Sequence, residues 1–140
     1  VRRFCHAQLP LTMPYVHIVA LLAVLQFFIF GILVGRARAR HGVKAPATSG
    51  HPRFERAFRV QMNTLEQLAG FLPCLLIAAA YWNGAVIAAV GAVYLIGRQI
   101  YRQAYMADPA KRSLGFILTV LPTAALFVAA LAGAVMRAAS

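Results

Sequence analysis

The chain has 140 residues, enough for one domain, and 61% of them are hydrophobic while only 12% are charged. Average soluble domains are about half apolar and about a quarter charged, so the excess excludes an ordinary soluble domain. The net charge of +11 comes from basic residues that lie between long apolar runs, a pattern that favours membrane anchoring and argues against nucleic acid as a partner.

The first apolar run predicts a membrane span over about residues 13–35, close to the ~20 residues that cross a hydrocarbon core. We expect His17 and Gln26, its polar interruptions, to form inter-helix hydrogen bonds or to lie near the interface. The chain begins with Val rather than Met, and Met13 opens the run. We therefore expect residues 1–12 to be an upstream extension, or Met13 to be the true start. A signal peptide is disfavoured because the run is too long and lacks a small-residue cleavage site.

The connection over residues 36–58 is the longest one predicted, and it is basic, with turn and breaker residues over 46–52. A second helix is predicted over about residues 54–82, with its span at about 59–81. Its first half is polar on one side and its second half is apolar. Pro73 predicts a kink that neighbouring helices can accommodate in a membrane.

The short uncharged turn at residues 82–84 predicts an antiparallel hairpin of the second and third helices. The third span is expected at about 85–106 and the fourth at about 114–136, separated by a breaker segment at 108–112. The sequence therefore predicts one all-α membrane domain over residues 1–140, a bundle of four transmembrane helices. Gly91, Gly97, Gly115 and Gly133 suit close association of helices.

Charge predicts the topology. The two basic connections fall on one side of four spans, and the positive-inside rule places that side in the cytoplasm with both termini outside. Arg2, Arg3 and Arg137 run against this assignment.

Polar residues form one stripe on each of the second and third helices. The second helix carries them at i, i+4 and i+7: Arg59, Asn63 and Glu66. The third helix carries them at i, i+4, i+7 and i+11: Tyr94, Arg98, Tyr101 and Tyr105. Both stripes lie toward the same membrane face, so we predict a shared polar cleft between the helices. For Tyr94 alone, apolar packing is the favoured interpretation.

Glu66 is an ionisable residue inside a predicted span, which is by default a functional hypothesis. One interpretation is a structural ion pair with Arg59 or Arg98 that holds the bundle together. The other is an external ligand, because donors outnumber the single carboxylate and arginine binds carboxylates with a planar fork. A ligand with several carboxylates and one ammonium fits the second interpretation.

The cysteines and histidines predict neither a disulfide nor a metal site. Cys5 precedes the first span, whereas Cys74 lies in the middle of a helix, where a small buried apolar role is favoured. The four histidines lack the spacing of metal ligands.

Two segments resemble a known family. Residues 54–66, FERAFRVQMNTLE, resemble the signature of the MAPEG family, the membrane-associated proteins of eicosanoid and glutathione metabolism. Residues 93–105, followed by Asp108-Pro-Ala-Lys-Arg112, look like the family's third-helix motif. The resemblance covers about residues 14–137. It implies a homotrimer of four-helix subunits with glutathione between neighbouring subunits at the cytosolic face, here in a bacterial inner membrane.

The resemblance also implies roles for individual residues. Arg112 would lie near the glutathione sulfur and act catalytically with Tyr105. Glutathione would be held by residues of three helices: Arg38, Arg59, Gln61, Asn63, Glu66, Arg98 and Tyr101. Arg36 and Arg40 compete with Arg38 for the role of the family's first-helix arginine.

The resulting hypothesis is a membrane glutathione transferase or peroxidase that joins the glutathione thiolate to lipophilic small molecules dissolved among membrane lipids. Gln67 and Ala69 stand where several members have an aromatic or amide residue and then a proline, so no specific eicosanoid activity is favoured. Two alternatives stay open: a non-enzymatic protein that binds a lipid or a partner on the same scaffold, and a structural subunit of a larger membrane complex.

Overall fold

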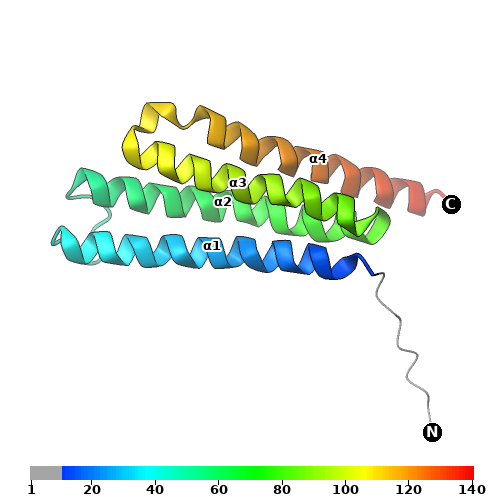
Figure 1. Cartoon of the computed structure of the whole chain (residues 1–140), viewed down its shortest axis with the longest axis horizontal. Coiled ribbons are helices and arrows are strands. Elements are labelled where there is room, and N and C mark those ends of the chain that lie inside the picture. The colour runs from blue at the N-terminus through cyan, green and yellow to red at the C-terminus, as the bar shows by residue number, and fades with distance from the viewer. Residues whose placement is uncertain (1–10) are drawn as a thin grey trace, which may run out of the picture.

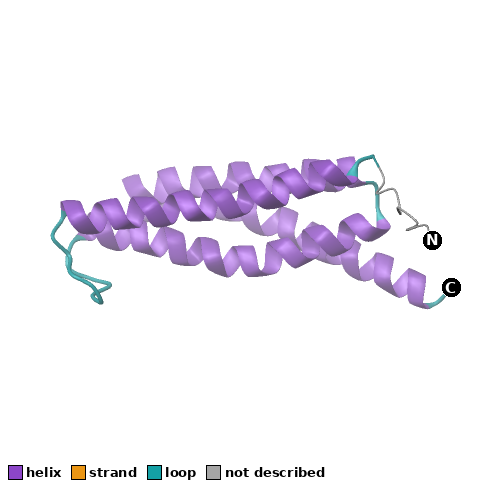
Figure 2. Ribbon diagram, turned by 90° about the horizontal axis from the view of Figure 1, so that it is seen from below, coloured by secondary structure: helices purple, strands orange, loops and turns teal. Residues whose placement is uncertain are grey.

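The computed structural model describes residues 11–140, and all regular structure within them is helical (Figure 2). The elements are α1 (Met13–Arg40), α2 (Pro52–Tyr81), α3 (Gly84–Ala107), the 3₁₀ helix η1 (Pro109–Lys111) and α4 (Ser113–Ala138). All four long helices are long and apolar enough to cross a membrane. The predicted four-helix membrane fold is confirmed, while the expectation for residues 1–12 falls almost wholly outside the described part of the chain.

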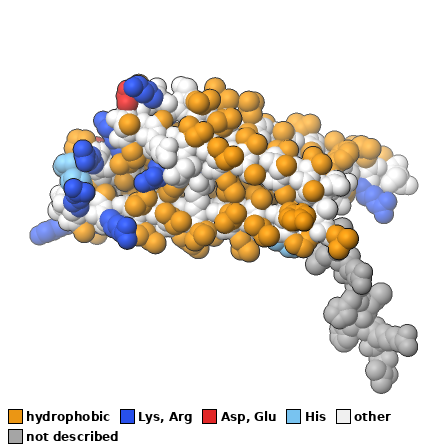
Figure 3. All heavy atoms as spheres, in the orientation of Figure 1, with side chains coloured by type: hydrophobic (Ala, Val, Ile, Leu, Met, Phe, Trp, Pro, Cys, Tyr) orange, Lys and Arg blue, Asp and Glu red, His pale blue; other side chains and the backbone are white. Residues whose placement is uncertain are grey.

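The four long helices lie side by side along one axis, with α1 and α4 on the outside and α2 and α3 between them (Figure 1). The α1–α2 loop and η1 lie at one end of this bundle, and the start of α1 and the C-terminus lie at the other (Figure 1). On the face that Figure 3 shows, basic side chains gather at the loop end and an apolar belt covers the middle. We call the loop end the basic end.

The predicted connection over residues 36–58 was too long, because both of its ends are helical. Helix α1 continues to Arg40 rather than ending near residue 35, and α2 begins at Pro52. Arginines near a helix C-terminus are stabilised by the helix dipole, which explains the extension of α1. Proline is well suited to the first turn of a helix, and the His51 side chain caps α2 by accepting a hydrogen bond from the Arg53 backbone N–H. The loop is therefore only residues 41–51.

Two interpretations of residues within the spans are confirmed. Tyr94 is fully buried and stacks on Phe71 of α2, with ring centroids 3.7 Å apart. Gln26 of α1 donates an inter-helix hydrogen bond to the Leu95 carbonyl of α3, at 3.1 Å. Cys74 is a free, half-buried thiol, and Cys5 lies outside the described residues.

Two of the glycines expected to favour helix association, Gly97 and Gly115, lie where α3 and α4 pack backbone against backbone. A Cβ at Gly97 would lie 2.6 Å from the Leu118 carbonyl carbon. A Cβ at Gly115 would meet the backbone of Tyr101. The close approach of α4 therefore fixes the segment of α3 that carries Tyr101.

Candidate functional site

The polar stripe of α2 lies on an open face of the helix bundle. Arg59 and Glu66 are exposed, and Asn63 is half-buried between them. The Asn63 amide donates to Glu66 Oε2 at 3.3 Å. Glu66 lies about 21 Å along the helix axis from the first residue of α2, so this open polar face extends well into a predicted span.

Arg98 of α3 is completely buried and points at α2. Its Nη1 donates to Asn63 Oδ1 at 3.0 Å, and its Nη2 donates to Thr64 Oγ1 at 2.6 Å. Among the described residues Glu66 forms no ion pair, either with Arg59 or with Arg98. Asn63 stands between Arg98 and Glu66 and bonds to both. We refer to these three residues as the Arg98–Asn63–Glu66 chain.

Thr64 is a residue of this site that the sequence analysis missed. Its hydroxyl donates to the Val60 carbonyl at 2.7 Å and accepts from Arg98, so both of its hydrogen-bonding capacities are used. Thr64 is buried, one position away from the exposed stripe. In the sequence, Thr64 is the one hydroxyl in an otherwise apolar internal stripe of α2. That is weak evidence for a site residue, because the threonine hydroxyl often bonds to a carbonyl of its own helix.

The end of α3 brings two tyrosines against the Arg98–Asn63–Glu66 chain. The Arg98 guanidinium lies over the Tyr101 ring, with Cζ 4.3 Å from the centroid. Tyr101 is almost fully buried, and the half-buried Tyr105 stacks beside it with centroids 5.5 Å apart. Tyr105 thus extends the same stripe toward the basic end.

Arg112 reaches the tyrosines from the corner between α3 and α4. Helix α3 ends at Ala107, and the Asp108 carboxylate caps η1 by accepting a hydrogen bond from the Ala110 N–H at 3.0 Å. Arg112 is exposed and directly precedes α4. Its guanidinium lies within electrostatic range of the Tyr101 hydroxyl. The structure therefore brings Arg112, Tyr101 and Arg98 into one neighbourhood.

Arg38 and Gln61 lie apart from this neighbourhood. Arg38 Nη1 donates to the carbonyls of Val43 and Ala47 at 3.4 and 2.9 Å, and its Cζ lies 4.6 Å from the centroid of the Phe54 ring. Arg38 thus holds the α1–α2 loop. Gln61 packs against Gly31 of α1. It faces away from Asn63 because two residues turn an α-helix by about 200°.

The charges of the assembled site are unbalanced. The candidate residues include three arginines, Arg59, Arg98 and Arg112, and a single carboxylate, Glu66. Such a face can bind an anion through its arginines, and Glu66 can pair with a cationic group of the same ligand.

A family model describes the relationship of this chain to known proteins. The model of the MAPEG family matches residues 16–132, which contain α2 and α3 completely and most of α1 and α4. The match covers both polar stripes and Arg112.

Individual relatives agree with the family match. The chain is 46% identical over 114 residues to an uncharacterised protein of Synechocystis sp., covering 81% of this chain and 83% of that protein. It is 37% identical over 102 residues to microsomal glutathione S-transferase 2 of Homo sapiens, covering 73% and 69%. It is 41% identical over 87 residues to leukotriene C4 synthase of Cavia porcellus, covering 62% and 58%.

Proposed function

This chain belongs to the MAPEG family, and from that premise we propose that it is a membrane glutathione transferase that joins the glutathione thiolate to lipophilic electrophiles. A function related to glutathione is supported at the level of the family by the likeness to microsomal glutathione S-transferase 2. The observation that carries the specific proposal is the Arg98–Asn63–Glu66 chain, which positions one carboxylate on an open, arginine-rich face.

Glutathione fits this face by its charges. It carries two carboxylates and one ammonium, so Arg59 would bind a carboxylate and Glu66 the ammonium. Asn63 would contact the peptide backbone. Arg98 is buried behind Asn63, and in this proposal it positions Asn63 rather than touching the ligand directly. Tyr101, which is held against Arg98, would complete the wall of the site.

Arg112 would act on the sulfur. A free thiol titrates near ~8.5, and the thiolate is the nucleophile. A guanidinium within hydrogen-bonding distance stabilises the thiolate and so lowers the pKa of the glutathione thiol. The thiol proton would leave to solvent at the basic end. The thiolate would then attack the electrophilic carbon of a substrate that enters from the bilayer, so that a C–S bond forms while the bond to the leaving group breaks and that group departs as its anion. Tyr105, beside Tyr101, would donate a hydrogen bond at this point.

A homotrimer belongs to the same proposal. Arg59 and Glu66 are exposed on a helix that can cross a membrane, and charged groups there need a covering partner. A neighbouring subunit would supply that cover, and Arg38 and Gln61 would then contact glutathione across the subunit boundary. Both side-chain hydrogen bonds of Arg38 are donated by one guanidinium nitrogen, Nη1, so the other N–H groups of the guanidinium can bind an anion. The site would face the cytoplasm of a bacterial inner membrane.

The test is calorimetric titration of the detergent-purified protein with glutathione, combined with conjugation to a model electrophile. Arg112→Ala should reduce conjugation at least ten-fold and leave glutathione affinity within about two-fold. Lys111→Ala removes the neighbouring cation and serves as the matched control, with both quantities unchanged. Native mass spectrometry of the same sample should report three copies.

Two outcomes would contradict the proposal. Absence of glutathione binding at millimolar concentration would refute the site itself. Glutathione binding without conjugation by the wild type would instead support a non-enzymatic binding protein on the same scaffold.

A further inference from the structure

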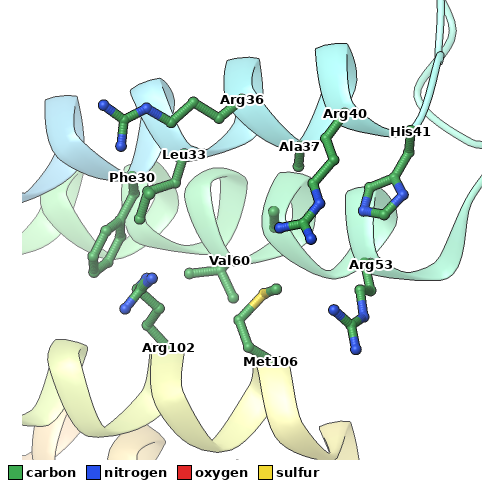
Figure 4. A pocket seen from close by; sticks show the side chains of 11 residues that line it. Phe30, Leu33, Arg36, Ala37, Arg40, His41, Arg53, Val60, Arg102 and Met106 are labelled. Carbon is green, nitrogen blue, oxygen red and sulfur yellow. The ribbon is translucent and has the colours of Figure 1, made fainter.

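A second, separate site lies between α1 and α3. A cavity of about 300 Å³ opens there at the basic end, with α2 as its floor (Figure 4). Its walls carry Arg36 and Arg40 from α1, Arg53 from α2 and Arg102 from α3. We call it the basic cavity. It does not include the exposed α2 stripe of the proposed glutathione site, so it is a different place in the fold.

A second cavity of about 280 Å³ adjoins it deeper along the same two helices. It is lined by Leu22, Leu25 and Ile29 of α1 and by Leu95 of α3, with Gln26 and Gln99 as its polar members. We call it the apolar cavity. The Phe30 side chain lines both cavities, so the two adjoin, and we call the pair the groove. The groove passes from the apolar belt to the basic end.

The charges of the basic cavity are unopposed. Four arginines and His41 line it, and no carboxylate does so among the described residues. Arg36 and Arg40 are exposed, and Arg102 is half-buried beneath Phe30, with Cζ 5.6 Å from the ring centroid. In Figure 4 the Arg40 and Arg102 side chains point into the space between α1 and α3. Cationic side chains that converge from two helices can bind the oxygens of one anionic group between them.

We propose that this groove binds an anionic membrane lipid, with its phosphate on the arginines of the basic cavity and one acyl chain along the apolar cavity. Arginine binds phosphate oxygens through its planar fork. The apolar half lies within the predicted spans, where the alternative occupant is a hydrocarbon chain rather than water. Basic pockets between transmembrane helices are suited to the headgroups of anionic lipids. The proposal does not rest on the function proposed above.

The proposal assigns roles to arginines that otherwise have none. Arg38, between Arg36 and Arg40 in sequence, turns to the loop carbonyls. Arg36 and Arg40 both line the basic cavity instead. The three positions therefore divide between a structural contact within the loop and a shared anion site.

The experiment uses the full chain, purified and delipidated in detergent, and measures lipid binding by native mass spectrometry and thermal shift. The probes are phosphatidylglycerol, phosphatidylcholine with matched chains, and inorganic phosphate. Phosphatidylglycerol should bind and stabilise the protein, at least ten-fold more tightly than phosphatidylcholine. Inorganic phosphate should not displace it at millimolar concentration, because it lacks the acyl chain.

The double variant Arg36→Gln/Arg40→Gln tests the location. Each removed charge should weaken binding of phosphatidylglycerol by about five-fold, so the double variant should lose about twenty-five-fold. Both residues are exposed, so folding should be retained, and glutathione titration should be unchanged. Lys111→Gln, a cation at the same end that lines neither cavity, is the matched control and should bind like the wild type.

Three results would overturn the proposal. Equal binding of phosphatidylcholine would show that charge does not select the occupant. Full displacement by inorganic phosphate would show a simple anion site without a lipid. An equal loss in the double variant and in Lys111→Gln would show a diffuse attraction of the basic end rather than a site in the groove.

Discussion

Arg98 of α3 donates a hydrogen bond to Asn63 of α2, with 3.0 Å between Nη1 and Oδ1. The guanidinium is completely buried, and it donates a second hydrogen bond to the Thr64 hydroxyl. The Asn63 amide is thereby oriented with its nitrogen toward Glu66. A buried cation thus sets the geometry of an exposed carboxylate without touching it.

Thr64→Val should destabilise the protein by about 1.5–3 kcal/mol, because it leaves a buried charged donor of Arg98 unsatisfied. It should also weaken glutathione binding, since Asn63 would lose part of its anchor. The thermal midpoint in detergent and a glutathione titration measure the two effects. Thr64→Ser keeps the hydroxyl and should stay close to the wild type. Equal loss in both variants would mean that packing of the methyl group, rather than the bond to Arg98, matters.

Glu66→Gln separates a ligand role from a structural one. Replacing the carboxylate by an amide should weaken glutathione binding about ten-fold, or ~1.4 kcal/mol, because the ammonium loses its counter-charge. Thermal stability should change little, since Glu66 is exposed. Glu55→Gln, at a carboxylate that accepts from the Gly50 N–H in the loop, is the control for charge alone. Loss of assembly with unchanged ligand binding would favour the structural-subunit alternative.

Gly115→Val should destabilise the protein by about 1–3 kcal/mol, because the added side chain meets the Tyr101 backbone where α3 and α4 touch. Conjugating activity should fall further than stability alone explains, because Tyr101 would be displaced. Gly70→Val is the control, since a Cβ at Gly70 meets nothing within 4 Å. The prediction is checked by thermal midpoint and activity in parallel. A Gly115→Val protein as stable as Gly70→Val would show that the two helices can separate freely.

The loop that closes the basic end should respond to pH through His41. Partial burial, followed by the positive charges of His51, Arg40 and Arg53, holds the pKa of His41 below 6.5. His41 stacks on His51 with ring centroids 3.7 Å apart. A lowered pKa means that the folded loop binds the proton less readily than the unfolded chain. Protonation of His41 therefore favours the unfolded chain. The stability of the folded loop is at its full value above pH 6.5 and decreases as the pH falls from there through the folded pKa of His41.

Histidine ring signals in an NMR pH titration measure this shift. His51→Gln removes one of the neighbouring charges and should bring the pKa of His41 closer to 6.5. His17→Gln changes a histidine on α1 outside the loop and should leave it unchanged. A His41 pKa above 6.5 in the wild type would show that the loop does not pack as described.

The sequence by itself determined the four spans, the basic end and both polar stripes. Each of these depends on local properties: the length of an apolar run, the helical period and the distribution of arginine. The same logic identified Tyr94 as a packing residue and Gln26 as an inter-helix donor. Its error was the length of the connection between α1 and α2. Arginines continue α1 and a proline begins α2, where the polar composition had predicted a loop.

The tertiary structure decided which side chains meet. It paired Arg98 with Asn63 and Thr64 instead of Glu66, turned Arg38 to the loop, and placed Gly97 and Gly115 at the contact of α3 with α4. Helical periodicity places a residue on a face, but it does not state how far two helices are rotated or shifted against each other. That relative placement depends on the close approach of α3 and α4 and on the core between all four helices. It also creates the groove between α1 and α3, whose residues are distant in sequence and share no motif.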